Sequence, residues 1–230
     1  MVLHSRLNRG FFLGGSMALA VLLGSAWVQA AGPAPRVVDV PTNPAFVKPP
    51  GGAERQARAG QALPYESVLR TQRPGRLQVQ LGDGRSFRLG GDAVLRLGRQ
   101  RLDLQRGQII AWINPGSKGG APVTIKTRVA TASIVGTTVF IEASETGLKI
   151  FSWEGEVECT TNDGQRKTLR SGEQLAFDQG LWTKTRLTPQ EASARRQKSI
   201  LLNGFSAPMD TLAVIEKELG ISGAGHSPSR

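Results

Sequence analysis

From residue 65 onward, apolar and polar residues alternate along the chain in short runs. Residues 77–81 alternate strictly, and Gly82-Asp83-Gly84 then interrupt the run with residues that favour a turn. A period of two places successive side chains on opposite faces of an extended strand. Turns recur roughly every eight to twelve residues and no helical period interrupts residues 77–182, which predicts an all-β domain over residues 65–182. The pattern leaves a short-strand β-sandwich, a barrel and a β-solenoid of short rungs as alternatives.

After residue 182 the pattern changes, and we expect a C-terminal extension of two helices over residues 183–220. Thr188 has the side chain of an N-cap, Pro189 fits the first helical position, and Glu191 places an acid in the first turn. This helix is expected to end near residue 202. A second helix is expected over residues 209–219, because large aliphatic residues recur on one face there.

The first thirty residues have the organisation of a secretory signal peptide. Basic residues precede an apolar stretch over residues 11–27, and small residues follow up to Ala30. Cleavage after Ala30 would export the protein to the periplasm or cell envelope. The apolar stretch is also close to the length of a membrane span, so an uncleaved leader that acts as an N-terminal anchor is the alternative.

Two further segments are predicted to lack a core of their own. Residues 31–64 contain seven of the thirteen prolines and few large apolar side chains, which predicts an extended linker. The alternative is an N-terminal strand near residues 37–40 that docks onto the β domain. Residues 221–230 are rich in Gly and Ser, and we expect a disordered tail there.

Composition argues against most kinds of enzyme. The only histidines, His4 and His226, lie near the two ends, and Cys159 is the only cysteine. These counts exclude a disulfide framework, a multi-cysteine zinc site and histidine catalysis in the middle of the chain. We therefore expect no catalytic residue, no metal and no cofactor, and we interpret Cys159 as a small buried apolar residue. Glu156 and Glu158 would share one strand face, which leaves a polysaccharide-acting enzyme as an alternative to an exposed strand edge.

The chain is strongly basic, with 29 Lys and Arg against 18 Asp and Glu and a formal net charge of +11. Arginines gather in the first half of the β region. This cluster has two interpretations. Either it forms a face that binds an anionic envelope polymer or partner protein, or the arginines occupy ordinary solvent-facing positions on alternating strands. Nucleic acid is not expected, because the protein is exported and the region has few aromatic residues for base stacking. The predicted face consists of Arg85, Arg88, Arg96, Arg99, Arg101 and Arg106.

A series of short motifs in this region resembles the FecR domain family of bacterial envelope proteins. The resemblance runs from Leu81-Gly82-Asp83-Gly84 to Ser171-Gly172-Glu173-Gln174, and it includes Val135-Gly136-Thr137 and Glu154-Gly155-Glu156-Val157. A glycine inside an otherwise strong strand, such as Gly136, indicates a bulge or a tight bend. We expect structural roles for the motif residues Asp83, Gly84, Gly107, Gly136, Thr137, Gly155 and Gly172.

The resemblance implies an exported β-rich domain that senses or binds a partner. In well-known FecR proteins, such a domain senses an outer-membrane receptor, and a cytoplasmic N-terminal segment controls a sigma factor across one membrane helix. Only ten residues precede the apolar stretch here, so we expect no cytoplasmic anti-sigma segment. The sequence therefore predicts a non-enzymatic envelope module that binds or senses a protein or an anionic ligand. The alternative is a membrane-anchored signalling regulator that works through a separate partner. The oligomeric state stays open.

Overall fold

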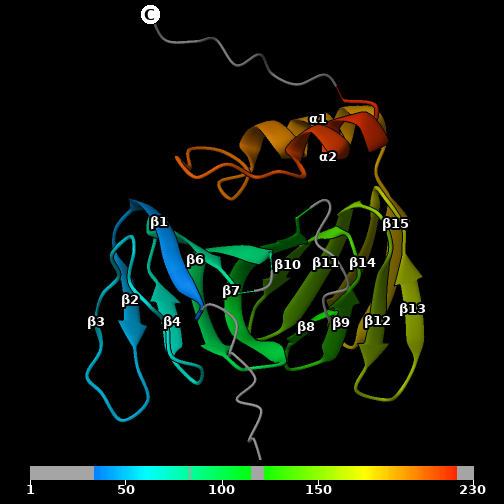
Figure 1. The fold of residues 1–230 in the computed structure, drawn as a ribbon. Coiled ribbons are helices and arrows are strands. Elements are labelled where there is room, and N and C mark those ends of the chain that lie inside the picture. Colours follow the sequence, from blue (N-terminus) through cyan, green and yellow to red (C-terminus); the bar gives the residue numbers. More distant parts are fainter. Residues whose placement is uncertain (1–33, 83, 115–121, 222–230) are drawn as a thin grey trace, which may run out of the picture. The chain divides into compact units, whose positions relative to one another are not determined.

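The two longest strands, β6 (Arg85–Leu97) and β7 (Arg101–Ile113), form an antiparallel hairpin around which the other elements are arranged (Figure 1). A computed structural model describes residues 34–82, 84–114 and 122–221. The predicted signal peptide over residues 1–30, Asp83 and the predicted tail beyond Ile221 lie outside the described residues.

The long hairpin is interrupted near its middle by a β-bulge. The pairing register shifts between Gly90 and Val94, and Gly107 on the facing strand has a φ of +88°. A Cβ atom at position 107 would lie 2.2 Å from the Cα of Ala93, so only glycine allows the two backbones to approach this closely. Bulges bend a strand pair. Each half of the hairpin consequently pairs with different neighbours and belongs to a different part of the sheet.

One part, here called the covered sheet, contains residues 85–90 of β6 and 107–113 of β7. All its pairings are antiparallel. Its strands follow in the order β1 (Arg36–Thr42), β5 (Arg76–Gln80), β6, β7, β10 (Thr138–Ala143), β11 (Gly147–Glu154), β14 (Glu173–Asp178) and β15 (Leu181–Arg186).

The other part, here called the open sheet, contains residues 94–97 of β6 and 101–104 of β7. Its pairings are antiparallel except the parallel pair formed by β7 and β8. Its strands follow in the order β3 (Arg55–Gln56), β2 (Ala45–Lys48), β4 (Val68–Thr71), β6, β7, β8 (Val123–Lys126), β9 (Ala130–Ile134), β12 (Val157–Thr161) and β13 (Arg166–Leu169).

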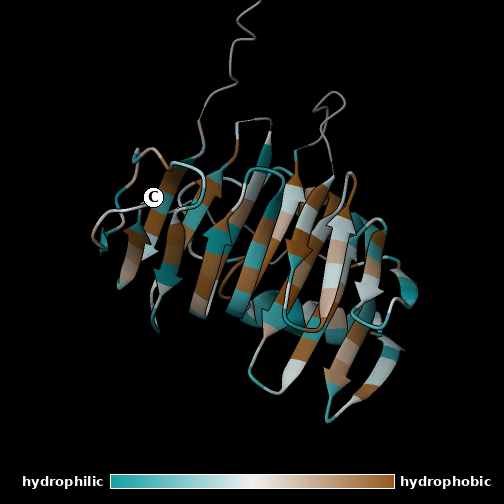
Figure 2. Cartoon of the chain, turned by 90° about the horizontal axis from the view of Figure 1, so that it is seen from below, coloured by the Kyte–Doolittle hydropathy of each residue, from teal (hydrophilic) through white to brown (hydrophobic). Residues whose placement is uncertain are grey.

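The two sheets enclose one hydrophobic core. Along β12, exposed Glu158 and Thr160 alternate with buried residues, so only one face of the open sheet is buried. The large buried residues of both sheets, such as Phe87 and Ile150 on one and Leu95 on the other, join a single cluster. The period-two alternation is visible along the strands in Figure 2. The predicted all-β class is confirmed, and of the alternatives the structure is a β-sandwich.

A second, smaller core lies on the other face of the covered sheet. There α1 (Pro189–Lys198) and α2 (Leu212–Glu218) lie across the strands (Figure 1). Trp112, Phe151 and Trp153 of the sheet pack against Leu201 and Ile215 of the C-terminal segment, together with three further buried residues. Within the described ranges, no helix is long and apolar enough to cross a membrane.

The predicted helical extension is present, with corrected ends. Thr188 caps α1 in a capping box with Glu191, as its residue pattern predicts. The helix ends at Lys198 and not near residue 202, because Ser199 has an extended backbone and the chain then turns toward the sheet. The extension also begins later than predicted, since β15 continues to Arg186.

The linker predicted over residues 31–64 is wrong for its described part. β1 pairs with β5, with Val37 opposite Val79, and β2 pairs with β4. Val37 and Leu63 are fully buried in the main core. The prolines misled the prediction because they occupy strand ends and turns, where no ladder hydrogen bond is required. The alternative of a docked strand near residues 37–40 describes this segment correctly.

Candidate functional site

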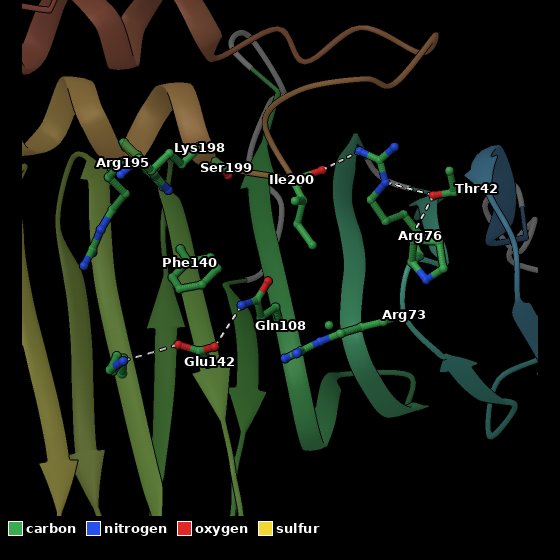
Figure 3. A pocket seen from close by; sticks show the side chains of 14 residues that line it. Thr42, Arg73, Arg76, Gln108, Phe140, Glu142, Arg195, Lys198, Ser199 and Ile200 are labelled. Atoms are coloured by element: carbon green, nitrogen blue, oxygen red, sulfur yellow. Dashed lines mark hydrogen bonds and ion pairs between the residues drawn. The ribbon is translucent and has the colours of Figure 1, made fainter.

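A groove of about 770 Å³ opens between α1 and the outer face of the covered sheet (Figure 3). It lies beside the smaller core, where the C-terminal segment no longer covers the strands. The lining residues come from four parts of the chain that are distant in sequence. They are Thr42, Arg73, Pro74, Arg76, Gly91, Gln108, Phe140, Glu142, Lys149, Trp153, Arg195, Lys198, Ser199 and Ile200.

The strand register builds the floor of the groove. Gln108 of β7 lies opposite Glu142 of β10, which lies opposite Lys149 of β11. Because these residues share one face, their side chains meet: Gln108 Nε2 donates to Glu142 Oε1 at 2.8 Å, and Lys149 Nζ lies 3.5 Å from Glu142 Oε2. The only acidic group lining this groove among the described residues is therefore already engaged by two partners.

Arg195 of α1 is held rigidly at the groove. Its guanidinium carbon lies 4.6 Å above the centroid of the Phe151 ring, and its Nη2 donates to Gln174 Oε1 at 2.7 Å. Burial lowers the pKa of Arg195, although the nearby carboxylates of Glu142 and Glu191 oppose the shift. Its Nη1 is buried and has no hydrogen-bond partner. A buried charged donor without a partner is costly, and because this atom is buried it is not exposed to a ligand in the groove.

Cations dominate the groove. Five Lys and Arg line it against Glu142 alone. Among the described residues, Arg76, Arg195 and Lys198 have no carboxylate within salt-bridge distance, whereas Arg73 pairs with Asp92 at 3.1 Å. Positive side chains in a concave site focus the field and raise the local concentration of anions. The arrangement is suited to binding an anionic group beside an apolar one, because the apolar Phe140, Pro74 and Ile200 line the same groove as the cations.

A second hollow of about 670 Å³ continues the groove along the strands. Arg73, Gly91, Glu142 and Lys149 line both hollows, so the two are adjoining. The second hollow adds Arg106 from β7 and the turn between β10 and β11. It also adds Asp92, Glu145 and Asp178, so acidic side chains outnumber basic ones in its lining. The combined groove is therefore elongated, which suits an extended ligand better than a compact one.

Three charged residues of the covered sheet fix the segment that follows α1. Arg76 Nη1 donates to the carbonyls of Ile200 at 2.8 Å and Asn203 at 2.9 Å (Figure 3 shows the first of these). Arg88 donates to the carbonyls of Leu201 and Ala207, both at 2.9 Å. Asp39 Oδ2 accepts the N–H groups of Ser206 and Ala207. The partners of these three side chains are all backbone groups of the segment that follows α1. The contacts thereby fix the position of α1 above the groove.

The six arginines predicted to form one face occupy separate environments. Arg88 is 2% exposed, so its prediction as a surface residue is wrong: the C-terminal segment covers the strand face on which it lies. Burial lowers the pKa of Arg88 to about 10. Arg96 and Arg101 each lie 3.0 Å from a carboxylate, Glu66 and Asp103 respectively.

The other three predicted arginines differ as well. Arg99 lies over the ring of Tyr65, and Arg85 Nη1 contacts the carbonyl of Pro122 at 3.5 Å. Only Arg106 lies in the groove, in its second hollow. The residues that the sequence prediction left out, above all Arg195 and Lys198, are instead on a helix. Arg195 and Lys198 are three residues apart, so they share one face of the helix. This spacing is the feature of the sequence that could have indicated them as site residues.

Three of the motif glycines lie where the chain crosses between the two sheets. Gly136 lies between β9 and β10, Gly155 between β11 and β12, and Gly172 between β13 and β14. The crossings also contact one another: a Cβ on Gly155 would lie 2.6 Å from Cγ2 of buried Thr137, and Gly155 N–H donates to Ser171 Oγ at 2.9 Å. These crossing residues therefore shape the sandwich, and Gly84 closes the β5–β6 turn. None of these lines the groove, whereas the motif residue Gly107 lines its second hollow.

The residues considered for catalysis do not form a reactive cluster. Glu156 lies 3.6 Å from Arg170 on the surface, and Glu158 is exposed on β12. Cys159 is 1% exposed, and burial raises the pKa of its thiol to about 12, which disfavours the reactive thiolate. Within the described part of the chain, no group of three His, Cys, Asp or Glu could hold a metal ion.

Residues 67–158 match the family model described as FecR protein, which confirms the resemblance for that segment. No curated protein matches the chain. Two crystal structures of a candidate anti-sigma factor from Parabacteroides distasonis are similar to it, with 20% and 19% identity and TM-scores of 0.45 and 0.48. The similarity covers 54% and 57% of this chain but only 61% and 64% of those chains, and it carries no argument about function.

Proposed function

Since residues 67–158 match the FecR family model, we propose that the protein is a non-enzymatic binding or sensing module of the periplasm or cell envelope. The observation that carries this proposal is the cationic groove of about 770 Å³ between α1 and the covered sheet. A groove lined by rigid elements, in which charged side chains converge beside apolar ones, is suited to binding a ligand. Its charge favours an anionic ligand, either a protein or an envelope polymer.

The location in the envelope is supported by the leader sequence alone. Expression of the full chain in a Gram-negative host, fractionation and sequencing of the mature N-terminus would test it. A periplasmic product that begins near Ala31 supports the module, and a product that stays in the cytoplasm contradicts the proposal.

The groove is tested by photo-crosslinking in cells. A benzoylphenylalanine at position 198, on the exposed end of α1, should form adducts with the ligand. The matched control carries the same group at position 166, which is exposed on β13 of the open sheet. Adducts that form equally from both positions, or from neither, would contradict a specific site in the groove.

The FecR match also favours a second candidate, a membrane-anchored signalling regulator that works through a separate partner. The two candidates use the same groove. They differ in whether the protein is soluble or anchored in the membrane. The same fractionation separates them: a membrane-bound product that keeps Met1 supports the regulator, and a soluble product that begins near Ala31 contradicts it.

A further inference from the structure

We propose that β15 is a docking edge, at which an extended acidic segment of a partner protein adds to the covered sheet as one more strand. This edge lies outside the groove, because no residue of β15 lines either hollow. It is thus separate from the site of the proposed function. Four strands end the two sheets, namely β1, β15, β3 and β13, and they differ in how their free edges are protected.

Three of these end strands are protected against pairing with another chain. β1 is covered by the chain near Gln61, whose carbonyl accepts Val37 N–H at 2.9 Å, and the register of β1 shifts twice. β3 has only two residues. β13 has four, and the carbonyl of Thr168 among them already accepts Lys184 Nζ at 2.8 Å. Short strands, bulges and covering segments are the usual means of protecting an edge.

β15 has none of these protections among the described residues. It is six residues long, contains no proline and pairs with β14 in an unbroken register. All its residues are exposed except Trp182, which is half-buried. A lysine can also protect an edge, but the ammonium of Lys184 is engaged by Glu173 at 2.8 Å and by the carbonyl of Thr168. The backbone of β15 is therefore open along its outer side.

The hydrogen-bond pattern shows which backbone groups of β15 point outward. Leu187 N–H donates to the carbonyl of Gly172 at 2.9 Å, in continuation of the β14–β15 register. Pairs that exchange hydrogen bonds alternate with pairs that do not in an antiparallel ladder. The N–H and C=O groups of Trp182, Lys184 and Arg186 consequently point away from β14. An added strand would bind to these groups through its own main chain.

The charges at this edge favour an acidic segment. Lys184 and Arg186 share one carboxylate, Glu173, at 2.8 and 3.4 Å. β13 lies at the same end of the sandwich (Figure 1), and its Lys167 takes part in no ion pair among the described residues. The other acid of β14, Asp178, lies at the far end of that strand and on the opposite face. The edge therefore has more cations than acids, and carboxylates on an added strand would complement it.

The same charges disfavour a second copy of the chain as the added strand. β15 contains two cations, Lys184 and Arg186, and no acid. Pairing of β15 with β15 of another copy would bring four cations to one edge, and like charges on neighbouring strands are destabilising. The occupant that fits is therefore a different protein with carboxylates on one face of an extended segment.

The test uses fluorescence anisotropy with the purified full chain and the fluorescein-labelled peptide Thr-Glu-Val-Glu-Val-Glu-Thr. In an extended chain its Glu residues share one face and its Val residues the other. The Glu face complements Lys184 and Arg186, and the Val face packs beside Thr183 and Thr185 on the other side of the sheet. A peptide with Gln in place of every Glu should bind about tenfold more weakly.

Two further peptides test main-chain pairing. One carries N-methyl groups on its Glu residues and the other on its Val residues. The N–H groups of alternate residues point to opposite edges of a strand, and only one edge of the peptide faces β15. One methylated peptide should therefore bind about tenfold or more weakly, whereas the other should bind like the parent. A peptide held by charge alone would not distinguish the two patterns.

Protein variants then locate the site. Lys184→Pro removes an outward N–H group and a cation without removing a backbone bond to β14, and it should weaken binding about tenfold or more. Arg186→Gln should weaken it about three- to tenfold. The side chain of Arg186 is 61% exposed, so this variant should fold normally even if Lys184→Pro does not. Arg36→Gln, at an exposed position of β1 at the other end of the covered sheet, is the matched control and should leave binding unchanged.

Several outcomes would overturn the docking edge. They are no binding of the parent peptide, equal binding of the two methylated peptides, and no effect of Lys184→Pro and Arg186→Gln. Sedimentation velocity of the chain alone tests the other occupant: a dimer that Lys184→Pro dissociates would assign the edge to a second copy and not to an acidic partner. None of these results bears on the groove, whose crosslinking test at position 198 does not involve β15.

Discussion

Arg88 shows how a single buried guanidinium can hold two parts of the fold together. Its three donor atoms serve Gln78 Oε1 at 2.8 Å and the carbonyls of Leu201 and Ala207, and its cationic plane lies 4.1 Å from the centroid of Phe205. No carboxylate lies within salt-bridge distance among the described residues, so hydrogen bonds, aromatic contact and a longer-range attraction to Asp39 offset its desolvation. Arg88 thereby joins the sheet to the C-terminal segment.

Arg88→Ala should lower the free energy of unfolding by about 3 kcal/mol or more. The substitution leaves two buried carbonyl groups and Gln78 without their donor, and each unsatisfied buried group costs about 1–3 kcal/mol. Urea unfolding measures the change. Arg96→Ala is the control, because Arg96 is half exposed and its ion pair with Glu66 is worth about 1 kcal/mol or less. Similar losses in the two variants would contradict the structural role of Arg88.

Glu154 is the second residue whose burial has a measurable consequence. It is 6% exposed at the end of β11, and Thr138 Oγ1 donates to its Oε1 at 2.9 Å while also contacting Thr211 Oγ1 at 2.8 Å. Burial raises the pKa of Glu154, the hydrogen bond from Thr138 opposes this shift, and the nearby Glu218 carboxylate adds to it. Folding therefore shifts Glu154 toward its protonated form relative to the unfolded chain.

A raised folded-state pKa makes this contribution to stability depend on pH. The stabilisation is fully present below the unfolded-state pKa of about 4.5 and is lost as pH rises through the folded-state pKa. Relative to Glu154→Gln, the wild type should become less stable between pH 4.5 and pH 8, as measured by urea unfolding across this range. Glu158→Gln, at an exposed position of β12, is the matched variant. The prediction would be refuted if the free energy of unfolding of the wild type rose relative to that of Glu154→Gln as pH increases.

At the scale of the element, the bulged β6–β7 hairpin decides the architecture. Each strand has thirteen residues, and the bulge divides it between the two sheets. The crossings at Gly136, Gly155 and Gly172 then carry later strands between the same two sheets. The glycines at these crossings are thus explained by backbone geometry at corners, and side chains of the covered sheet's outer face form the groove.

Gly107→Ala should destabilise the protein strongly, by more than about 3 kcal/mol. Position 107 combines a φ of +88° with a backbone neighbour only 2.2 Å from the new Cβ, so the hairpin would have to move. Gly164→Ala is a close control, because its φ is +85° and nothing lies within 4 Å of the new Cβ. It should cost only the left-handed strain of about 1–2 kcal/mol. Equal shifts of the two urea midpoints would show that close packing at Ala93 is unimportant.

At the scale of the whole molecule, the segment before residue 65 completes the core. Leu63 is fully buried, and its N–H donates to the carbonyl of Pro35 at 2.7 Å, while Val37 N–H donates to the carbonyl of Gln61 at 2.9 Å. β1 and β2 add an edge region to each sheet. A protein without this segment would therefore expose part of its main core.

Leu63→Ala should lower the free energy of unfolding by about 2–5 kcal/mol, the usual cost of truncating a fully buried leucine. Leu181→Ala, at a position that is 73% exposed on β15, should change it by about 0.5 kcal/mol or less. Thermal unfolding of both variants would measure the difference. If Leu63→Ala were as harmless as Leu181→Ala, residues 34–64 would be a linker after all.

The sequence alone determined the all-β class, the capped helix at Thr188 and the burial of Cys159, because each depends on local period or residue type. It could not place Arg88 or the prolines of residues 34–64, since an alternating pattern does not tell what covers a face. The groove depends on Arg73, on Glu142 and Lys149 of the β10–β11 hairpin, and on Arg195, which come from three distant segments. Only the register of β7, β10 and β11 and the docking of α1 bring them together, and these are set by long-range packing.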